Sequence, residues 1–496
     1  MVAVLLLSVK AFAQLPPELQ NPEIISINRM PMRSSAFGFE NMEKAKQYDR
    51  EKSVNFFSLN GSWKFNWVQD PNQRPEKFFE LGYNDANWDN FRIPASWEVN
   101  GYGLPIYVNQ PYDFAGHNLR YEKMNPPFDI PDKNNPVGSY RKKINLPADW
   151  KGKQVFIHVG NAKSCLFLWV NGKKVGYSED SKLAAEFDIT KFVKEGENLI
   201  AFQVYRWSDA SYLECQDMFR FSGIERDVFL YATEKLNVRD TKIVSTLDDS
   251  YAHGLLSINA EIDNYKTEHG LYSKKDSLTV EVSLEDAKGN VVYQDKTKDF
   301  KTILGKYKTN IEFQTTIKNV QKWSAETPYL YRLYITLKDV KGVVKEVVPL
   351  RIGFKKVEIK GVDFFVNGKR VFIKGVNRHE HHPTNGHTLS KGDMRKDMEM
   401  MKKLNVNAVR HSHYPPDPYW MELCDEFGLY VVDEANIESH PLAIDEKTQL
   451  GNEMSWLPAH QARIERMVER DRTFFEQLAS RKATASTGGD HHRIPF

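Results

Sequence analysis

Cysteine is scarce in this sequence, and so are long apolar runs and any excess of one charge. Three cysteines are too few for a disulfide framework, so they do not decide the redox compartment: Cys165, Cys215 and Cys424. No apolar run approaches the ~18 residues that a membrane span requires. The 68 basic and 66 acidic residues leave a net charge of +2, which gives no electrostatic reason to expect nucleic acid or an anionic membrane as a partner.

Aromatic residues, in contrast, are abundant. They make up 12% of the 496 residues and include 10 tryptophans, which is more than a core alone requires and is consistent with surfaces on which sugars stack. A chain of this length predicts two to four domains.

The first 56 residues have no steady periodicity. Residues 1–14 (MVAVLLLSVKAFAQ) combine an apolar run with an Ala-x-Ala ending at Ala13, which predicts the remnant of a signal peptide and an exported, periplasmic or extracellular protein. No basic residue precedes the run, so a buried N-terminal strand of a cytoplasmic protein is the alternative. Residues 15–56 are rich in proline and charge, and we expect an extended arm over other domains.

Two all-β regions follow. Residues 57–232 contain short aromatic and β-branched runs, and Asn171-Gly172 predicts a type I′ hairpin turn, so a β-sandwich is expected. Two long polar stretches, residues 94–112 and 206–228, interrupt it. Residues 233–353 alternate apolar and polar positions over several strands, which predicts an immunoglobulin-like β-sandwich.

From residue 354 onward the pattern becomes strand, helix, strand, helix, strand. Strands are expected at residues 371–376, 407–411 and 429–433, with helices at 392–405, 417–428 and 460–472. Each strand ends in a group of polar residues, and chemistry gathers at the carboxyl ends of strands in a (β/α)₈ barrel. Residues 354–472 therefore predict the first three βα units of an incomplete TIM barrel.

Three motifs stand at these strand ends: GVNRHEHHP, AVRHSHYP and VVDEANIESH. In this order and spacing they resemble glycoside hydrolase family 2, and most of all its large β-galactosidases, from about Phe57 to about Arg472. The resemblance implies a jelly-roll sugar-binding domain for residues 57–232 and a catalytic barrel that hydrolyses terminal β-D-galactosides, lactose-like substrates, with retention. It also implies that full-length relatives oligomerise.

The resemblance assigns roles to eight residues. Asn109 and Asp217 would bind galactosyl hydroxyls, and Asp217 would also lie near a sodium ion. His379 and His413 would support the transition state, while Arg410 and Asn436 would position the substrate. Glu438 and His440 match two magnesium ligands, whose third partner in the family is the acid/base glutamate.

The sequence departs from the family after Arg472. A family barrel would continue to a Trp-x-x-Gly-Asn-Glu motif, whereas residues 473–496 form a tail without it. Neither the acid/base nor the nucleophile glutamate has a counterpart, and Glu380, Glu434 and Glu438 match neither role, so an inactive fragment is expected. Whether the tail is biological or a frame error stays open.

Two other interpretations compete. The chain could be a non-catalytic carbohydrate-binding protein that consists of two sandwiches and a barrel remnant. His379 and His381, which alternate on the first predicted barrel strand, also resemble the metal-dependent amidohydrolases, although the later motifs follow the glycosidase pattern.

Overall fold

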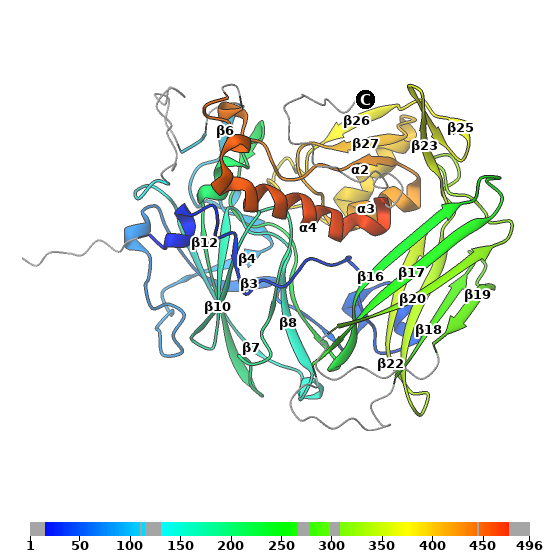
Figure 1. Cartoon of the computed structure of the whole chain (residues 1–496). Coiled ribbons are helices and arrows are strands. Elements are labelled where there is room, and N and C mark those ends of the chain that lie inside the picture. The colour runs from blue at the N-terminus through cyan, green and yellow to red at the C-terminus, as the bar shows by residue number, and fades with distance from the viewer. Residues whose placement is uncertain are drawn as a thin grey trace, which may run out of the picture.

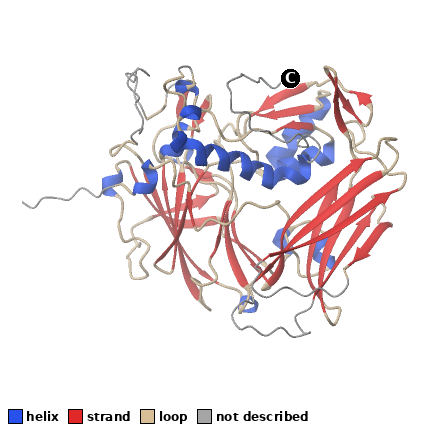
Figure 2. Cartoon of the chain, in the orientation of Figure 1, coloured by secondary structure: helices blue, strands red, loops and turns tan. Residues whose placement is uncertain are grey.

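The computed structural model describes residues 15–109, 112–114, 130–265, 278–297, 308–443 and 446–475. The signal-peptide prediction for residues 1–14 and nearly all of the predicted tail, residues 476–496, lie outside the described residues. Two β-sandwiches stand side by side, and a smaller part with most of the helices lies across one end of both (Figures 1 and 2). Within the described ranges, no helix is long and apolar enough to cross a membrane.

The first sandwich packs a large sheet against a small one. The large sheet has the order β1-β10-β9-β12-β7-β3-β4, and the small one the order β11-β8-β15-β2. Their bounds are β1 (Ser26–Ile27), β2 (Phe56–Ser58), β3 (Gly61–Val68), β4 (Asp89–Ile93), β7 (Val137–Asn145), β8 (Gln154–Val159), β9 (Cys165–Val170), β10 (Lys173–Glu179), β11 (Ala185–Asp188), β12 (Glu197–Tyr205) and β15 (Val228–Thr233).

The side chains of β9 alternate between two apolar layers. Leu166 and Leu168 face the core between the two sheets, while Phe167 and Trp169 face a second cluster on the outer side. The turn from β9 to β10 is the predicted one, because Asn171 and Gly172 both have positive φ, 51° and 83°. Four short strands form two small ribbons at the end of this sandwich: β5 (Ala95–Ser96) with β14 (Gly223–Ile224), and β6 (Ile106–Val108) with β13 (Met218–Arg220).

The second sandwich packs the sheet β16-β17-β20 against the sheet β19-β18-β21-β22. A core of alternating side chains lies between them, as the sequence pattern predicts. The bounds are β16 (Leu236–Leu247), β17 (Gly254–Asn264), β18 (Leu278–Glu285), β19 (Val291–Lys296), β20 (Lys308–Ile317), β21 (Tyr331–Asp339) and β22 (Val344–Ile352).

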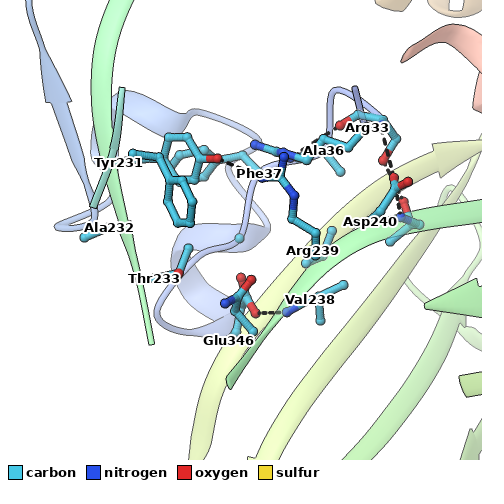
Figure 3. Close-up of a pocket in the computed structure, with 16 residues that line it drawn as sticks. Arg33, Ala36, Phe37, Tyr231, Ala232, Thr233, Val238, Arg239, Asp240 and Glu346 are labelled. Atoms are coloured by element: carbon cyan, nitrogen blue, oxygen red, sulfur yellow. Dashed lines mark hydrogen bonds between the residues drawn. The ribbon is translucent and has the colours of Figure 1, made fainter. Parts of the chain in front are cut away.

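Residues 15–56 run over both sandwiches. β1 adds to the edge of the first through β10, and Phe39 exchanges two backbone hydrogen bonds with Val347 of the second. Figure 3 shows Phe37 of the arm beside Tyr231 of the first sandwich, and Arg33 of the arm near Asp240 of the second. Short helices complete this arm and the connecting loops: η1 (Pro17–Gln20), α1 (Met42–Ala45), η2 (Arg50–Lys52), η3 (Pro71–Gln73), η4 (Glu98–Asn100), η6 (Ala148–Trp150) and η7 (Asp209–Tyr212).

The barrel part contains two small sheets and three longer helices. An antiparallel sheet comes first, β23 (Val357–Lys360), β24 (Asp363–Val366) and β25 (Lys369–Arg370). A parallel sheet follows, β26 (Gly375–Arg378), β27 (Ala408–His411) and β28 (Tyr430–Val432). The helices are α2 (Lys391–Lys403), α3 (Pro418–Phe427) and α4 (Leu457–Phe475), with the short η9 (His440–Leu442), η10 (Leu450–Asn452) and η11 (Met454–Trp456). The predicted fold class, two sandwiches and an incomplete barrel, is confirmed.

The first barrel strand differs from its prediction at residues 371–376. β26 begins only at Gly375, because the side chain of Asn407 bonds the preceding backbone: it accepts from the Lys374 amide at 2.7 Å and donates to the Phe372 carbonyl at 2.8 Å. A side chain thus takes the place of a strand neighbour. Since β26 ends at Arg378, His379 and His381 do not alternate on a strand, and the argument for an amidohydrolase loses its geometric basis.

Helix α4 fastens the barrel part to both sandwiches, and Figure 1 shows it lying across them. Arg466 pairs with Asp180 of the first sandwich at 3.0 Å, and Arg472 pairs with Asp240 on β16 of the second. Arg463 pairs at 3.0 Å with Glu214, in the long loop of residues 206–228.

Candidate functional site

A loop of the first sandwich reaches the carboxyl ends of the barrel strands. In the stretch 206–228, the carbonyl of Leu213 accepts from the Glu438 amide at 2.7 Å, and the amide of Cys215 donates to the Glu438 carbonyl at 2.8 Å. Burial raises the pKa of the Cys215 thiol to about 12, so this residue is an inert neighbour and not a nucleophile.

The same loop brings Asp217 beside Tyr107. β6 and β13 pair antiparallel with Val108 opposite Met218, so Asn109 directly follows the end of β6 and Asp217 directly precedes β13. The hydroxyl of Tyr107 donates to Oδ1 of Asp217 at 2.6 Å. Tyr107 and Asp217, 110 positions apart in the sequence, are therefore in direct contact at this exposed ribbon.

His379 and His413 meet at the ends of β26 and β27. Their rings lie edge to face, with centroids 6.1 Å apart, and Tyr414 lies against His379. Burial lowers the pKa of His379 and the charges of His413 and Lys182 lower it further, whereas Asp217 opposes them. The ribbon also lies against the barrel strand ends, because His381 stacks on Phe219 with ring centroids 5.8 Å apart and Gln216 donates to the carbonyl of His413 at 3.5 Å.

Arg410 and His413 both bind Glu434. Nε of Arg410 donates to one carboxylate oxygen, and Nδ1 of His413 lies 2.7 Å from the other. Because a carboxylate can only accept, Nδ1 is the donor in this pair. Partial burial alone would raise the pKa of Glu434, but these two bonds outweigh it and lower the pKa. Glu434 is thus an ionised anchor that orients Arg410 and His413.

Glu380 is a buried structural carboxylate. Arg226 donates to it at 2.6 Å and the Asp417 amide at 2.7 Å. Burial alone would raise its pKa, yet Arg226, Arg378 and Lys182 overcome this and hold the pKa at about 2. Glu380 therefore ties the end of the sandwich loop to the barrel and is not available as a general acid.

Asn436 is only 1% exposed. It accepts from Gln216 at 2.8 Å and donates to Asp180 at 3.2 Å, so it joins the sandwich to the segment after β28. These two bonds hold Asn436 between the sandwich loop and the barrel.

Glu438 and His440 face each other on the segment after β28. Nδ1 of His440 lies 3.4 Å from Oε1 of Glu438, and this buried nitrogen has no hydrogen-bond partner among the described residues. Nε2 of His413 lies 3.9 Å from Oε2 of Glu438. In the described ranges no three His, Cys, Asp or Glu side chains converge on one metal position. The two residues fit a hard cation that keeps several waters.

Several residues of the site carry no signal of their own in the sequence. Gln216, Asp180 and Lys182 stand in ordinary loop and turn contexts, and only the packing of the loop on the barrel brings them to the site. Tyr107 could have been found, because it stands two positions before Asn109 in the same short run, IYVN.

Three family models match consecutive parts of the chain. "Glycosyl hydrolases family 2, sugar binding domain" matches residues 56–234, "Glycosyl hydrolases family 2" residues 236–355, and "Glycosyl hydrolases family 2, TIM barrel domain" residues 357–474.

Curated relatives are similar over nearly the whole chain. A beta-galactosidase of Priestia megaterium is 39% identical over 477 residues, 95% of this chain and 45% of that protein. One of Halalkalibacterium halodurans is 39% identical over 461 residues, 92% of this chain and 43% of that protein. The chain thus spans less than half the length of these relatives.

Solved structures share the fold. A Bacteroides uniformis beta-glucuronidase matches with a TM-score of 0.69 at 23% identity, over 84% of this chain and 45% of that chain. A Bifidobacterium dentium beta-glucuronidase matches with a TM-score of 0.65 at 20% identity, over 84% of this chain and 66% of that chain. The three matched domains and the curated relatives show that this chain belongs to glycoside hydrolase family 2.

Proposed function

We propose that this chain forms the galactose-binding and first barrel portion of a retaining β-galactosidase, a glycosidase of carbohydrate catabolism. One observation supports the proposal: the sandwich ribbon contacts the barrel strand ends, since Phe219 stacks on His381 and Gln216 donates to the carbonyl of His413. Asn109 and Asp217 would hold galactosyl hydroxyls. The two histidines would bond the sugar as its ring flattens, which accelerates the reaction only if these bonds strengthen in the transition state.

For the chain of 496 residues by itself, we propose carbohydrate binding without turnover. Retaining hydrolysis needs two carboxyl groups about 5 Å apart, one as acid and base and one as nucleophile. Two carboxylates near the site already have other partners, since Glu380 binds Arg226 and Glu434 binds Arg410 and His413. Glu438 faces imidazoles and not a second carboxyl group.

Two cations belong to this proposal. Glu438 and His440 would hold Mg²⁺ together with water molecules, and the ion would supply positive charge beside the leaving group. Na⁺ would lie near Asp217, whose carboxylate is exposed. Calorimetric titration with Mg²⁺ tests the first site: Glu438→Gln should weaken binding at least tenfold, and an unchanged affinity would refute it.

The test of the proposed function is binding of methyl β-D-thiogalactoside, which is not hydrolysed, compared with methyl β-D-thioglucoside. The galactoside should bind at least tenfold more tightly, and Asp217→Ala should abolish that preference, because a site built around a sugar hydroxyl rejects the epimer. Lys151→Ala, at an exposed ion pair with Glu195, is the control. Equal binding of both epimers would refute the proposal, and rapid turnover of a chromogenic β-galactoside would refute the absence of catalysis.

We also propose that the protein is exported. The apolar run and the Ala-x-Ala ending at Ala13 support this. N-terminal sequencing of the protein from its natural source should begin at Gln14, and a start at Met1 would contradict export by this route.

A further inference from the structure

The ribbon that carries Asn109 and Asp217 has two faces of opposite character. Tyr107 is paired directly with Phe219 across the ribbon, and its hydroxyl donates to Asp217, so these three side chains lie on one face. The other face is closed against the protein, because Met218 and Arg220 are buried.

The exposed face divides into a polar half and an aromatic half. Asp217 forms the polar half, and Tyr107 and Phe219, 56% and 39% exposed, form the aromatic half. The two rings lie edge to face with centroids 5.3 Å apart. A paired exposed aromatic surface directly beside a sugar-binding pair is not what a solvated loop requires.

Both rings are held in place by the site. The Tyr107 hydroxyl donates to Asp217 at 2.6 Å, which fixes that ring beside the carboxylate. The ring of His381, from the loop after β26, stacks on the ring of Phe219, with centroids 5.8 Å apart and an interplanar angle of 11°. Phe221, the residue after β13, also stacks on the Phe219 ring, with ring centroids 5.6 Å apart. The aromatic surface is thus rigid before any ligand arrives, which reduces the entropy cost of binding.

We propose that Tyr107 and Phe219 form an aglycone-binding wall, so that this site prefers β-galactosides whose leaving group has a flat apolar face. An aryl group and the apolar face of a second pyranose ring share this chemistry. The proposal rests on the proposed function, because it assumes that the galactosyl ring occupies Asn109 and Asp217. With the galactosyl hydroxyls on the polar half, the group attached to the anomeric carbon lies over the adjoining rings. His381 then acts as a positioning residue that supports Phe219.

The test compares three non-hydrolysable ligands on the whole chain by calorimetry: methyl β-D-thiogalactoside, phenyl β-D-thiogalactoside and thiodigalactoside. An aromatic contact contributes ~0.5–1.5 kcal/mol, which converts to a roughly 2- to 12-fold preference for phenyl over methyl. Phe219→Leu should reduce the phenyl-to-methyl ratio to nearly one. Leu104→Ala, at an exposed apolar residue outside the paired positions, should keep the wild-type ratio. If the wild type also binds thiodigalactoside more tightly than the methyl thiogalactoside, and Phe219→Leu loses this preference together with the phenyl preference, the wall binds sugar rings as well. If the wild type has no such preference for thiodigalactoside, the wall binds aryl groups alone.

Failure of this inference differs from failure of the proposed function. If methyl and phenyl thiogalactosides bind equally, or if Phe219→Leu keeps the preference, the wall is refuted while galactose binding stands. If neither ligand binds, the proposed function fails and the wall fails with it. Tyr107→Phe, which keeps the ring and removes the hydroxyl, should keep the phenyl-to-methyl ratio, and a ratio lost in this variant would show that the bond to Asp217 and not the ring sets the preference.

Discussion

The two sandwiches and the barrel part differ in how completely they bury their strands. Each sandwich closes its own core between two sheets, and its central strands have neighbours on both sides, as β12 has in β7 and β9. The barrel part has a three-stranded parallel sheet and a small core. Around it, apolar side chains such as Phe372, Ile373 and Val432 are exposed in the described structure. Parallel strands normally bury both faces.

The barrel part therefore depends for its stability on its contacts with the sandwiches. Its attachments are the ion pairs of α4 and the backbone bonds between the sandwich loop and Glu438. The site lies on this junction, so its geometry depends on the sandwiches holding the barrel strands in place. Each prediction below tests this contrast.

The largest expected difference is in hydrogen exchange. Amides of β28 should exchange at least ~1,000-fold faster than those of β12, because local opening requires far less free energy than global unfolding. β28 pairs only with β27 in the described structure. β4 is the control, since it too is an edge strand, but of a sandwich. If β28 is as well protected as β12, or if β4 exchanges as fast as β28, the contrast between the regions is wrong.

The second prediction breaks the junction itself. Arg463→Met leaves the carboxylate of Glu214 buried without its cation, which should cost about 3–5 kcal/mol in the docking of α4. Exchange at α4 and β28 should accelerate while β12 stays protected. Arg370→Met is the matched control, because Arg370 pairs with Asp363 at the surface and such pairs contribute ~0–1 kcal/mol. Equal effects of the two variants would show that the ion pairs of α4 do not hold the barrel part.

The sequence predicts the local features of this contrast and misses the long-range ones. Apolar alternation indicates both sandwiches, and Asn171-Gly172 indicates its hairpin, because strand faces and turn geometry depend on neighbouring residues. The polar strand ends indicate the site. In contrast, Arg463 and Arg466 meet partners 249 and 286 positions away, which no local pattern encodes. The late start of β26 has the same origin, since a single side chain, Asn407, replaces the strand ladder.

The third prediction concerns the junction of the arm and the sandwiches, where Glu346 is buried (Figure 3). Burial raises its pKa from the ordinary 4.5 to about 7, although the Val238 amide donates to it and Arg33 lies near, and Glu234 raises it further. The folded state therefore holds a proton that the unfolded state has lost between pH 4.5 and 7. The contribution of Glu346 to stability is full below pH 4.5 and lost as the pH rises through 7.

Glu346→Gln should accordingly match the wild type near pH 4.5 and exceed it by about 3 kcal/mol at pH 8, measured by urea unfolding of the sandwiches. Glu186→Gln is a control of opposite sign. Burial alone would raise the pKa of Glu186, but Arg33 and Arg239 lower it well below its usual value, so this variant should be less stable at pH 8. A constant difference between Glu346→Gln and the wild type from pH 4.5 to 8 would contradict the prediction.

The smallest expected effect compares one substitution in both regions. Gly172 on the sandwich hairpin and Gly361 between β23 and β24 both have positive φ, 83° and 62°. Around each, an added Cβ has room: the nearest atom at Gly172 is 3.8 Å away, and nothing lies within 4 Å at Gly361. Alanine therefore adds about 1–2 kcal/mol of backbone strain at either position and no clash.

The strain should lower the stability only of the cooperative unit that contains the glycine. Gly172→Ala should lower the free energy of unfolding of the sandwich by the full ~1–2 kcal/mol of backbone strain, because β9 and β10 belong to its large sheet. Gly361→Ala should leave this unfolding transition in place and accelerate exchange in β23 and β24 alone, since within the described ranges these strands pair with each other and with β25 and with no further strand. If Gly361→Ala shifts the sandwich transition as much as Gly172→Ala does, the barrel part and the sandwiches unfold as one unit.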